Sequence, residues 1–292
     1  MFQESINIHE KQSPFKTILI VIFIITTIIF LILFINEKKK NQLLTKNTSL
    51  YKPDINNYIP IKEQLYEDRI KGAKQLQGIH DILNTSYIGK IDFYNKKSDS
   101  NILILENFKT YQQTSEYSCG CSSLIMSLYY LNKTEISERD CVYKSNTGTD
   151  IKKNTHGTIG VFPTDLEKAI INYGFDIESN RNFTNENSPI NNELLFSNYI
   201  KDSIKKKEPI IILTPDWGGH YEVIVGYDNM GTENYIGDDV LIIADPYDST
   251  DHIQDGFIVW NFIRYFYLLK VPVYFIEPEQ NKLQFIRVKN RK

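Results

Sequence analysis

The chain has 292 residues, of which 41% are hydrophobic and 24% are charged, and its formal net charge at pH 7 is -3. This composition is that of a folded protein and excludes an intrinsically disordered chain. The small negative charge gives no electrostatic reason to expect nucleic acid as a partner. A disulfide scaffold is also excluded, because the 3 cysteines can form one pair at most.

An uncharged apolar run near the N-terminus predicts a membrane-spanning helix. It covers residues 17–35, follows a short polar tail at 1–16, and is long enough to cross a bilayer once. No small-residue cleavage site of the signal-peptide type follows, since the run is succeeded by Asn36, Glu37 and three lysines. We therefore expect a permanent single-pass anchor in a cell membrane and not a cleaved leader.

The charges beside this run bear on its orientation. Two lysines precede it, while four follow it within residues 38–46. A literal count of these lysines under the positive-inside rule places the C-terminal side in the cytoplasm. The positive N-terminal amine reduces the difference in charge between the two sides.

A spacer is expected between the anchor and the main domain. Residues 36–100 are rich in Asn, Lys and Tyr and contain few apolar clusters, so they are expected to pack only partly on the domain. A loose apolar stripe predicts a helix at 62–83. The β-rich run 101–105 predicts the first strand of the domain proper.

The stretch 111–131 joins a cysteine to an apolar helical pattern. Apolar residues recur at i, i+3, i+4 and i+7, at Cys121, Leu124, Ile125 and Leu128. Ser118 is a candidate N-cap and places Cys119 in the first turn. There the partial positive charge of the helix N-terminus stabilises a thiolate, as a cysteine nucleophile requires. Gln113 lies six residues upstream, where its amide can reach the oxyanion formed by attack on a carbonyl.

Two further helices are expected after this one. The first opens at Pro163 with a capping box from Thr164 to Glu167 and closes at Gly174. The second covers residues 192–206. The period then changes to short β-rich runs bounded by Pro, Gly, Asp and Asn, at 210–213, 221–227, 240–244 and 271–276.

Helices followed by an antiparallel-looking sheet indicate an α+β domain. We place this domain at residues 101–277 and expect a basic C-terminal tail at 278–292.

A candidate base and its orienting partner come from the predicted sheet. His220 begins one strand after a glycine turn, and Asp245 ends another strand. His220 can share the proton of Cys119, while Asp245 can hold the other ring N–H and fix the tautomer. Asp216 and Asp228 flank the histidine strand and are rival orienters. They are less favoured because a neighbour on the same strand cannot easily face the same side.

In their order, these residues resemble the papain-like cysteine peptidases. The closest resemblance is to the bacterial double-glycine leader peptidases that process bacteriocins (peptidase C-thirty-nine-like) and to their stand-alone relatives. The matching motifs are Gln113, Cys119-Gly120, Gly219-His220-Tyr221, Gly226-Tyr227-Asp228 and Asp245-Pro246-Tyr247. The resemblance covers about residues 100–276. It implies a papain-like α+β fold, with the nucleophile on a helix and the base and its partner on the sheet.

The resemblance also implies a role for each matching position. These are the oxyanion glutamine Gln113, the nucleophile Cys119, the base His220 and the orienting carboxylate Asp245. Relatives commonly carry a proline or small residue after Cys-Gly, whereas this chain has Cys121. No ATP-binding cassette follows, so an exporter is not expected. Anchored stand-alone relatives usually face outward, which favours an extracytoplasmic catalytic domain.

The cysteines, one histidine and one tryptophan also allow interpretations other than catalysis. A cysteine such as Cys119 is more often a buried structural thiol when it stands alone. A zinc site can be imagined from Cys119, Cys121, Cys141 and His156, but zinc sites favour two paired Cys units and the chain has no second pair. We expect no metal or organic cofactor. Trp217 either shields the imidazole–carboxylate pair from water or caps the core.

Together these features predict a membrane-anchored cysteine peptidase that acts on a peptide or protein substrate. One alternative keeps the thiol acyl-enzyme but resolves it with an amine, as a transferase or amidase does. The other is a papain-like module that binds peptides without cleaving them.

Overall fold

The structure is a computed structural model that describes residues 23, 25–35, 55–62, 91–147, 160–184, 186–249, 254–271 and 284–291. It divides into two units, Met1–Lys52 and Pro53–Lys292. In the first unit the described residues are helical and exposed. A search of the described residues finds no helix that combines the length and the apolar character needed to span a bilayer. Of the predicted span, residues 17–22 and 24 lie outside the described part.

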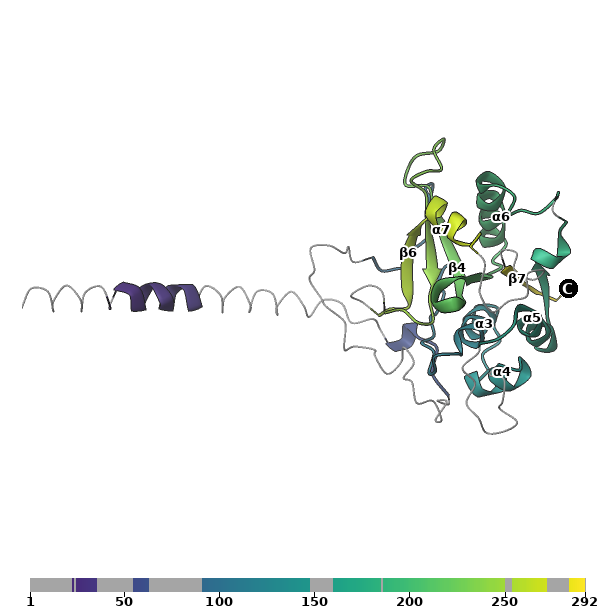
Figure 1. The fold of residues 1–292 in the computed structure, drawn as a ribbon, viewed down its shortest axis with the longest axis horizontal. Helices are drawn as coiled ribbons and strands as arrows, with labels where there is room; N and C mark the ends of the chain where they lie inside the picture. Colours follow the sequence, from purple (N-terminus) through teal and green to yellow (C-terminus); the bar gives the residue numbers. More distant parts are fainter. Residues whose placement is uncertain are drawn as a thin grey trace, which may run out of the picture. The chain divides into compact units, whose positions relative to one another are not determined.

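The second unit is built on an antiparallel sheet, which has seven strands in the part of the chain that the structure describes (Figure 1). The strands are β1 Ile102–Ile104, β2 Phe175–Ser179, β3 Ile210–Thr214, β4 His220–Asp228, β5 Val240–Ala244, β6 Phe257–Asn261 and β7 Gln284–Asn290. Their order is β2-β7-β3-β4-β5-β6, and β1 also pairs with β4. Helices with an antiparallel sheet confirm the predicted α+β class.

Strand β4 is the centre of this sheet. Its first half pairs with β3 and its second half with β1, while β5 occupies the other edge. Every residue from His220 to Tyr227 is buried. A run of Val, Ile and Tyr suits a strand covered on both faces. The polar residues within this run are therefore held rigidly inside the molecule.

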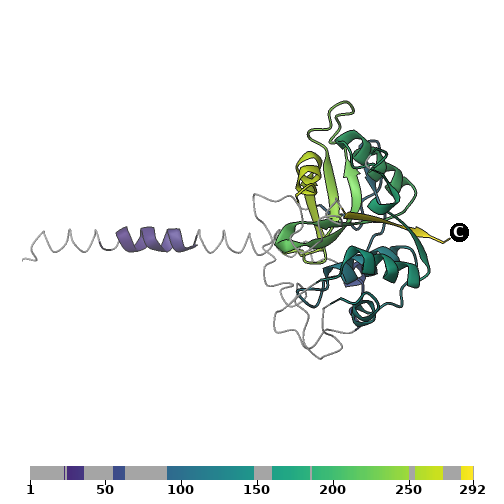
Figure 2. The same cartoon turned by 45° about the vertical axis from the view of Figure 1, so that its right-hand side comes forward.

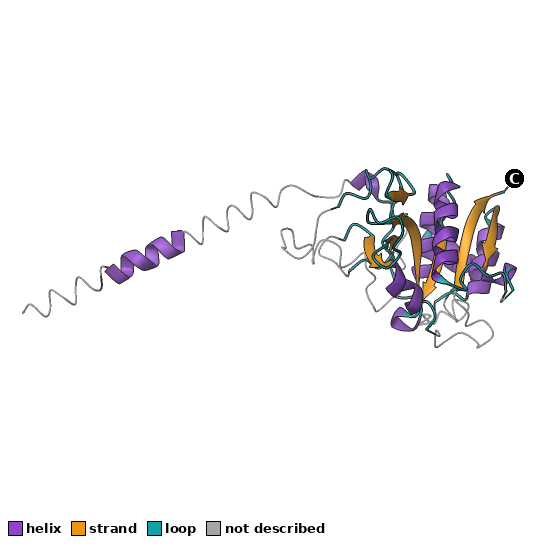
Figure 3. Cartoon of the chain, turned by 90° about the horizontal axis from the view of Figure 1, so that it is seen from above, coloured by secondary structure: helices purple, strands orange, loops and turns teal. Residues whose placement is uncertain are grey.

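Helices pack against the strands, as Figure 3 shows. They are α3 Cys119–Tyr130, α4 Glu138–Lys144, α5 Pro163–Asn172, α6 Glu193–Lys205 and α7 Phe262–Leu268. Short 3-10 turns lie at η2 Ile55–Asn57, η4 Asn180–Asn182 and η5 Asp216–Gly218. Figures 1 and 2 show α3, α4 and α5 as one group, apart from α6 and α7.

Helix α3 is buried on all sides from Cys119 to Leu128, and not on one face alone as the apolar spacing suggests. Its close approach to β4 depends on Gly120. A Cβ at this position would lie 2.2 Å from Val161 Cγ1 and 3.1 Å from the Tyr221 ring. Glycine is therefore required here because of space.

The start of α5 corrects one prediction. Phe162 is the N-cap residue and Pro163 is the first helical residue, so Thr164 already lies inside the helix and cannot form a capping box. Proline is tolerated as the first helical residue because the N–H that it lacks would have no intrahelical partner there. The end agrees with the sequence, since Gly174 follows the helix with φ 96°.

The prediction of a basic C-terminal tail at 278–292 is wrong over its described part. Strand β7 lies between β2 and β3 inside the sheet. Its central basic residue, Arg287, is only 4% exposed because its guanidinium bonds Glu208 Oε2 at 2.6 Å and Asp202 Oδ2 at 3.0 Å. The charge of Arg287 is therefore paired inside the protein, whereas Arg291 at the end of the segment is exposed.

Parts of the predicted spacer pack on the second unit. The backbone N–H of Ile59 donates to Thr110 O at 2.8 Å, and Tyr94 is buried. Residues 63–90, which include most of the helix predicted at 62–83, lie outside the described residues. The strand predicted at 271–276 lies outside them beyond Val271.

Candidate active site

Cys119 is the first residue of α3, in the first turn as predicted. It lies at the end of the helix where backbone N–H groups lack intrahelical partners and give a positive potential. Ser118 occupies the N-cap position, but its hydroxyl donates to Ser115 O at 3.3 Å and makes no cap bond. Cys119 is 6% exposed, so its thiol is almost wholly inside the protein.

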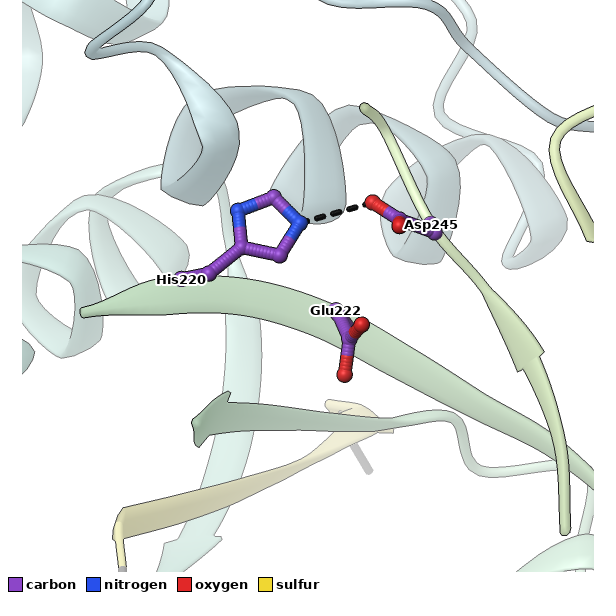
Figure 4. A group of neighbouring side chains, drawn as sticks. All are labelled: His220, Glu222 and Asp245. Carbon is purple, nitrogen blue, oxygen red and sulfur yellow. Dashed lines mark hydrogen bonds and ion pairs between the residues drawn. The ribbon is translucent and has the colours of Figure 1, made fainter. Parts of the chain in front are cut away.

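His220 and Asp245 meet where β4 begins and β5 ends. His220 Nε2 lies 2.7 Å from Asp245 Oδ1, and both side chains are buried. Figure 4 shows the imidazole turned toward this carboxylate, with its second nitrogen pointing away. The rival Asp228 lies at the opposite end of β4, where its carboxylate accepts the Met230 N–H at 2.7 Å.

The environment of His220 favours the imidazolium. Burial alone would lower the pKa of His220, but the Asp245 carboxylate outweighs burial and holds that pKa well above its usual value. The neighbouring Cys119 adds a further increase to the pKa of His220. Because Asp245 occupies Nε2, the nitrogen left for the thiol is Nδ1. The bond from His220 to Asp245 and the influence of Cys119 on the pKa of His220 indicate that the three predicted residues lie in one site.

The Asp245 carboxylate is itself fixed by the turn that follows β5. Its Oδ1 also accepts the backbone N–H of Tyr247 at 2.7 Å. The next carbonyl, Pro246 O, accepts the backbone N–H of Gln113 at 2.9 Å. This bond ties the loop before Cys119 to the carboxylate end of the site.

Gln113 lies inside the loop that leads to Cys119 and is 1% exposed. Its Nε2 donates to Ser115 O at 2.6 Å, and its Oε1 has no hydrogen-bond partner among the described residues. An amide nitrogen carries two hydrogens, so one remains for another acceptor. Among the described residues, Gln113 makes no hydrogen bond to Cys119 or His220. Its predicted oxyanion role therefore stays a prediction.

Trp217 covers the imidazole from the solvent side. Its ring centroid lies 5.1 Å from that of His220 and 5.2 Å from that of Tyr247, both in edge-on contacts. The side chain is 68% exposed, so of the two predicted roles the shield fits and the core cap does not. Its backbone is left-handed, with φ 51°, a conformation that non-glycine residues rarely adopt.

Glu222 is a buried acid beside this pair that sequence reasoning missed. It lies two residues after His220 on β4, is 2% exposed, and accepts the Tyr265 hydroxyl at 2.8 Å. Burial, with a further contribution from Asp245, raises the pKa of Glu222 to about 8, so the group is neutral at pH 7. The signal in the sequence was a single acid inside an otherwise apolar strand.

Ligand atoms of His220, Glu222 and Asp245 lie within 4.8 Å of one another. A cation could bind all three only by breaking the direct bond between His220 and Asp245. The geometry is that of a histidine with its orienting carboxylate.

The other two cysteines are structural. Cys121 Sγ lies 3.4 Å from the hydroxyls of Ser145 and Thr147, and both Cys121 and Cys141 are fully buried. Burial, followed by the neighbouring Cys121 thiol, raises the pKa of Cys141 well above its usual value. Neutral buried thiols react slowly. His156, the fourth member of the imagined zinc site, lies outside the described residues.

Comparisons with known proteins place this site in a family. A family model described as "Peptidase_C39 like family" matches residues 105–266, more than half of the chain. No curated protein matches the chain.

Two solved structures are similar at 16% identity. One is a double glycine motif protease from an AMS/PCAT transporter in complex with the leader peptide, where the match covers 62% of this chain and 91% of that chain with a TM-score of 0.36. The other is the peptidase domain of Streptococcus ComA, a bi-functional ABC transporter of a quorum-sensing pathway, where it covers 63% and 99% with a TM-score of 0.39. The matched region of the family model encloses all four predicted site residues, and the chain belongs to this Peptidase_C39 like family.

Proposed function

We propose that the chain is a cysteine peptidase that hydrolyses peptide bonds in a peptide or protein substrate. Cys119 is the nucleophile, His220 the general base, Asp245 the orienting carboxylate and Gln113 an oxyanion donor. The observation that carries the proposal is the buried His220–Asp245 bond of 2.7 Å, on a ring whose pKa is raised further by the neighbouring Cys119.

The reaction begins with proton transfer from Cys119 Sγ to His220 Nδ1. The thiolate attacks the substrate carbonyl, and the resulting oxyanion accepts hydrogen bonds from the Cys119 backbone N–H and the Gln113 amide. The imidazolium protonates the leaving amine. His220 then deprotonates a water molecule, which hydrolyses the thioester and restores the free thiol.

The local electrostatics support this order of events. The Asp245 carboxylate favours the imidazolium by raising the pKa of His220, and the N-terminus of α3 presents a positive potential where Cys119 lies. Both effects stabilise the ion pair that attacks the substrate. Trp217 keeps bulk water away from one side of the imidazole, which strengthens its interaction with the carboxylate.

The proposal extends to the membrane. We propose that residues 17–35 anchor the chain and that the unit Pro53–Lys292 acts on substrates outside the cytoplasm. An uncharged apolar run of this length supports the anchor. The outward orientation follows the pattern of anchored stand-alone relatives.

Labelling and cleavage together test the peptidase proposal. The full-length chain is treated with iodoacetamide at neutral pH and, separately, with a peptide library. We expect Cys119 to be alkylated first and the parent to cleave peptides. The Cys119→Ala variant should not cleave peptides. The Cys141→Ala variant is the control, because it loses a thiol outside the site, and it should cleave them. Preferential labelling of Cys141 would refute the nucleophile, and peptide binding without cleavage would show a binding module.

A further inference from the structure

The loop that leads into the nucleophile must be held in place for Gln113 to act. One attachment is the bond from the Gln113 backbone N–H to Pro246 O, on the sheet side of the site. A second attachment comes from the helical side, where Glu138 begins α4. Its side chain is 0% exposed, and neither the family motifs nor the proposed reaction assigns it a role.

The Glu138 carboxyl collects hydrogen bonds from both flanks of Gln113. Upstream, the Tyr111 hydroxyl donates to Oε2 at 3.0 Å. Downstream, Thr114 donates twice, from its backbone N–H to Oε1 at 3.0 Å and from its hydroxyl to Oε2 at 2.8 Å. One side chain thus binds the loop at two residues, one on each side of Gln113.

Stabilisation of the fold alone does not explain a buried carboxyl such as that of Glu138. Burial raises the pKa of Glu138, and the hydrogen bonds from Thr114 and Tyr111 oppose this increase. Apolar side chains of similar volume often stabilise an interior as well as buried charged groups do. A carboxyl that accepts from both a backbone N–H and neighbouring hydroxyls instead specifies one loop conformation.

We propose that Glu138 is a positioning residue, which holds the loop on both sides of Gln113 and so fixes that amide relative to Cys119. The inference rests on the peptidase function proposed above. It assigns Glu138 no contact with substrate. A displacement of about 1 Å at a catalytic group can cost about 10²-fold in rate, so loosening the loop should lower turnover more than it lowers substrate binding.

Two pairs of variants of the full-length chain test the proposal. Glu138→Gln weakens the carboxyl as an acceptor, and Thr114→Val removes one hydroxyl donor without changing the volume. Thr114→Ser retains the hydroxyl and should restore the parent behaviour. Asp239→Asn is the matched control, because Asp239 is a buried carboxyl that accepts a tyrosine hydroxyl, from Tyr227, at the end of β5 opposite Asp245.

Turnover, Cys119 alkylation and amide exchange are measured well below each melting temperature. For Glu138→Gln and Thr114→Val we expect kcat to fall about 10-fold to 10²-fold with KM changed less than threefold. Alkylation of Cys119 should stay within about threefold of the parent, and amides of 111–118 should exchange faster. Asp239→Asn should lower the melting temperature only.

Two outcomes separate this inference from the proposed function. If the parent cleaves peptides and both variants lose stability with unchanged kcat, Glu138 is merely structural and the inference is overturned. Thr114→Val decides the matter if Glu138→Gln does not fold. If the parent never cleaves peptides, the proposed function fails, and only amide exchange tests the role of Glu138. If the amides of 111–118 then exchange no faster in Glu138→Gln and Thr114→Val than in Asp239→Asn, the positioning role is overturned as well.

Discussion

At the residue scale, the Asp245 carboxylate has two effects on His220, orientation through Nε2 and an increase of the imidazole pKa. An amide at this position preserves the first effect and removes the second. For Asp245→Asn we therefore expect a folded protein whose turnover falls less than that of Cys119→Ala. Loss of the anion lowers the pKa of His220, so the imidazolium is lost at a lower pH. The alkaline limb of kcat/KM should move to lower pH.

The pH profiles of parent and variant check this, with Asp228→Asn as the control. Asp228 lies at the other end of β4 and is expected to leave the profile unchanged. An inactive Asp228→Asn beside an unaffected Asp245→Asn would show that the orienter had been assigned to the wrong aspartate.

Glu222 should make stability depend on pH. Its folded pKa of about 8 lies above the usual 4.5, so between these values the folded state holds a proton that the unfolded state has lost. Stability contributed by this group is therefore fully present below pH 4.5 and is lost as pH rises to about 8.

The Glu222→Gln variant cannot titrate and should show a shallower decline over this window. Urea unfolding of both proteins at pH 5 and pH 8 measures the difference. Glu233→Gln, at an exposed glutamate in the turn after β4, is the charge-matched control and should follow the parent. Equal slopes for parent and Glu222→Gln would contradict an ionisable role for this buried acid.

Cys119, His220 and Asp245 could be predicted because each lies at the boundary of an element that the sequence pattern marks. Glu138 and Glu222 could not. Their partners are distant in sequence, as in the bonds from Tyr111 to Glu138 and from Tyr265 to Glu222. An isolated glutamate in a sequence normally indicates a solvated surface, so nothing in the sequence marks Glu138 as buried. The apolar strand around Glu222 does suggest burial, but only tertiary structure shows its partner.

At the element scale, the strongly periodic segments were predicted well and the mixed ones were missed. β3 and β5 are apolar runs, β4 has an apolar centre from Val223 to Val225, and α6 has both a cap and a regular stripe. β2 alternates acids with apolar residues, and β6 passes directly into α7 without a turn signal. β7 was missed because the partners of Arg287 come from around α6, far away in the chain.

Because β7 lies inside the sheet, its removal should prevent folding. Deleting residues 284–292 would leave β2 and β3 with unpaired edges and would remove the buried Phe285 and Val288. Circular dichroism and solubility measure the result. Deleting only 291–292 removes an exposed ion pair from Arg291 to Asp176, worth about 0–1 kcal/mol, and should leave the fold intact. A cooperative, soluble product of the longer deletion would contradict this.

The contact between α3 and β4 gives a second prediction at this scale. For Gly120→Ala we expect a loss of about 1–3 kcal/mol, because the new methyl overlaps Val161 and crowds Tyr221. Moving the start of α3 should also slow turnover. Gly160→Ala is the control, since its Cβ would meet the nearest atom, Tyr117 O, at an ordinary 3.6 Å. Chemical denaturation compares the two; equal stabilities would show that α3 can shift without cost.

At the scale of the whole molecule, the elements that support the site extend over more of the chain than the region that contains the site residues. All four predicted site residues lie within the family match at 105–266, whereas β7, which completes the sheet between β2 and β3, lies beyond it. Residues 55–62, before the match, also contribute a pairing, between Tyr58 and Thr110. A fragment cut at the limits of the family match would therefore lose structure that the site depends on.

The proposed anchor gives the last prediction. Transfer of an uncharged apolar run of this length into a bilayer is strongly favourable, so the full-length chain should remain in the membrane fraction after alkaline extraction. Deleting residues 1–35 should release an active protein, whereas deleting 1–16 should not. Protease added to intact cells should digest the unit Pro53–Lys292, because we propose that it lies outside the cytoplasm. Protection of this unit would instead support the opposite orientation, which the lysines at 38–46 indicate. A mature N-terminus beyond Asn36 in membrane extracts would refute a permanent anchor.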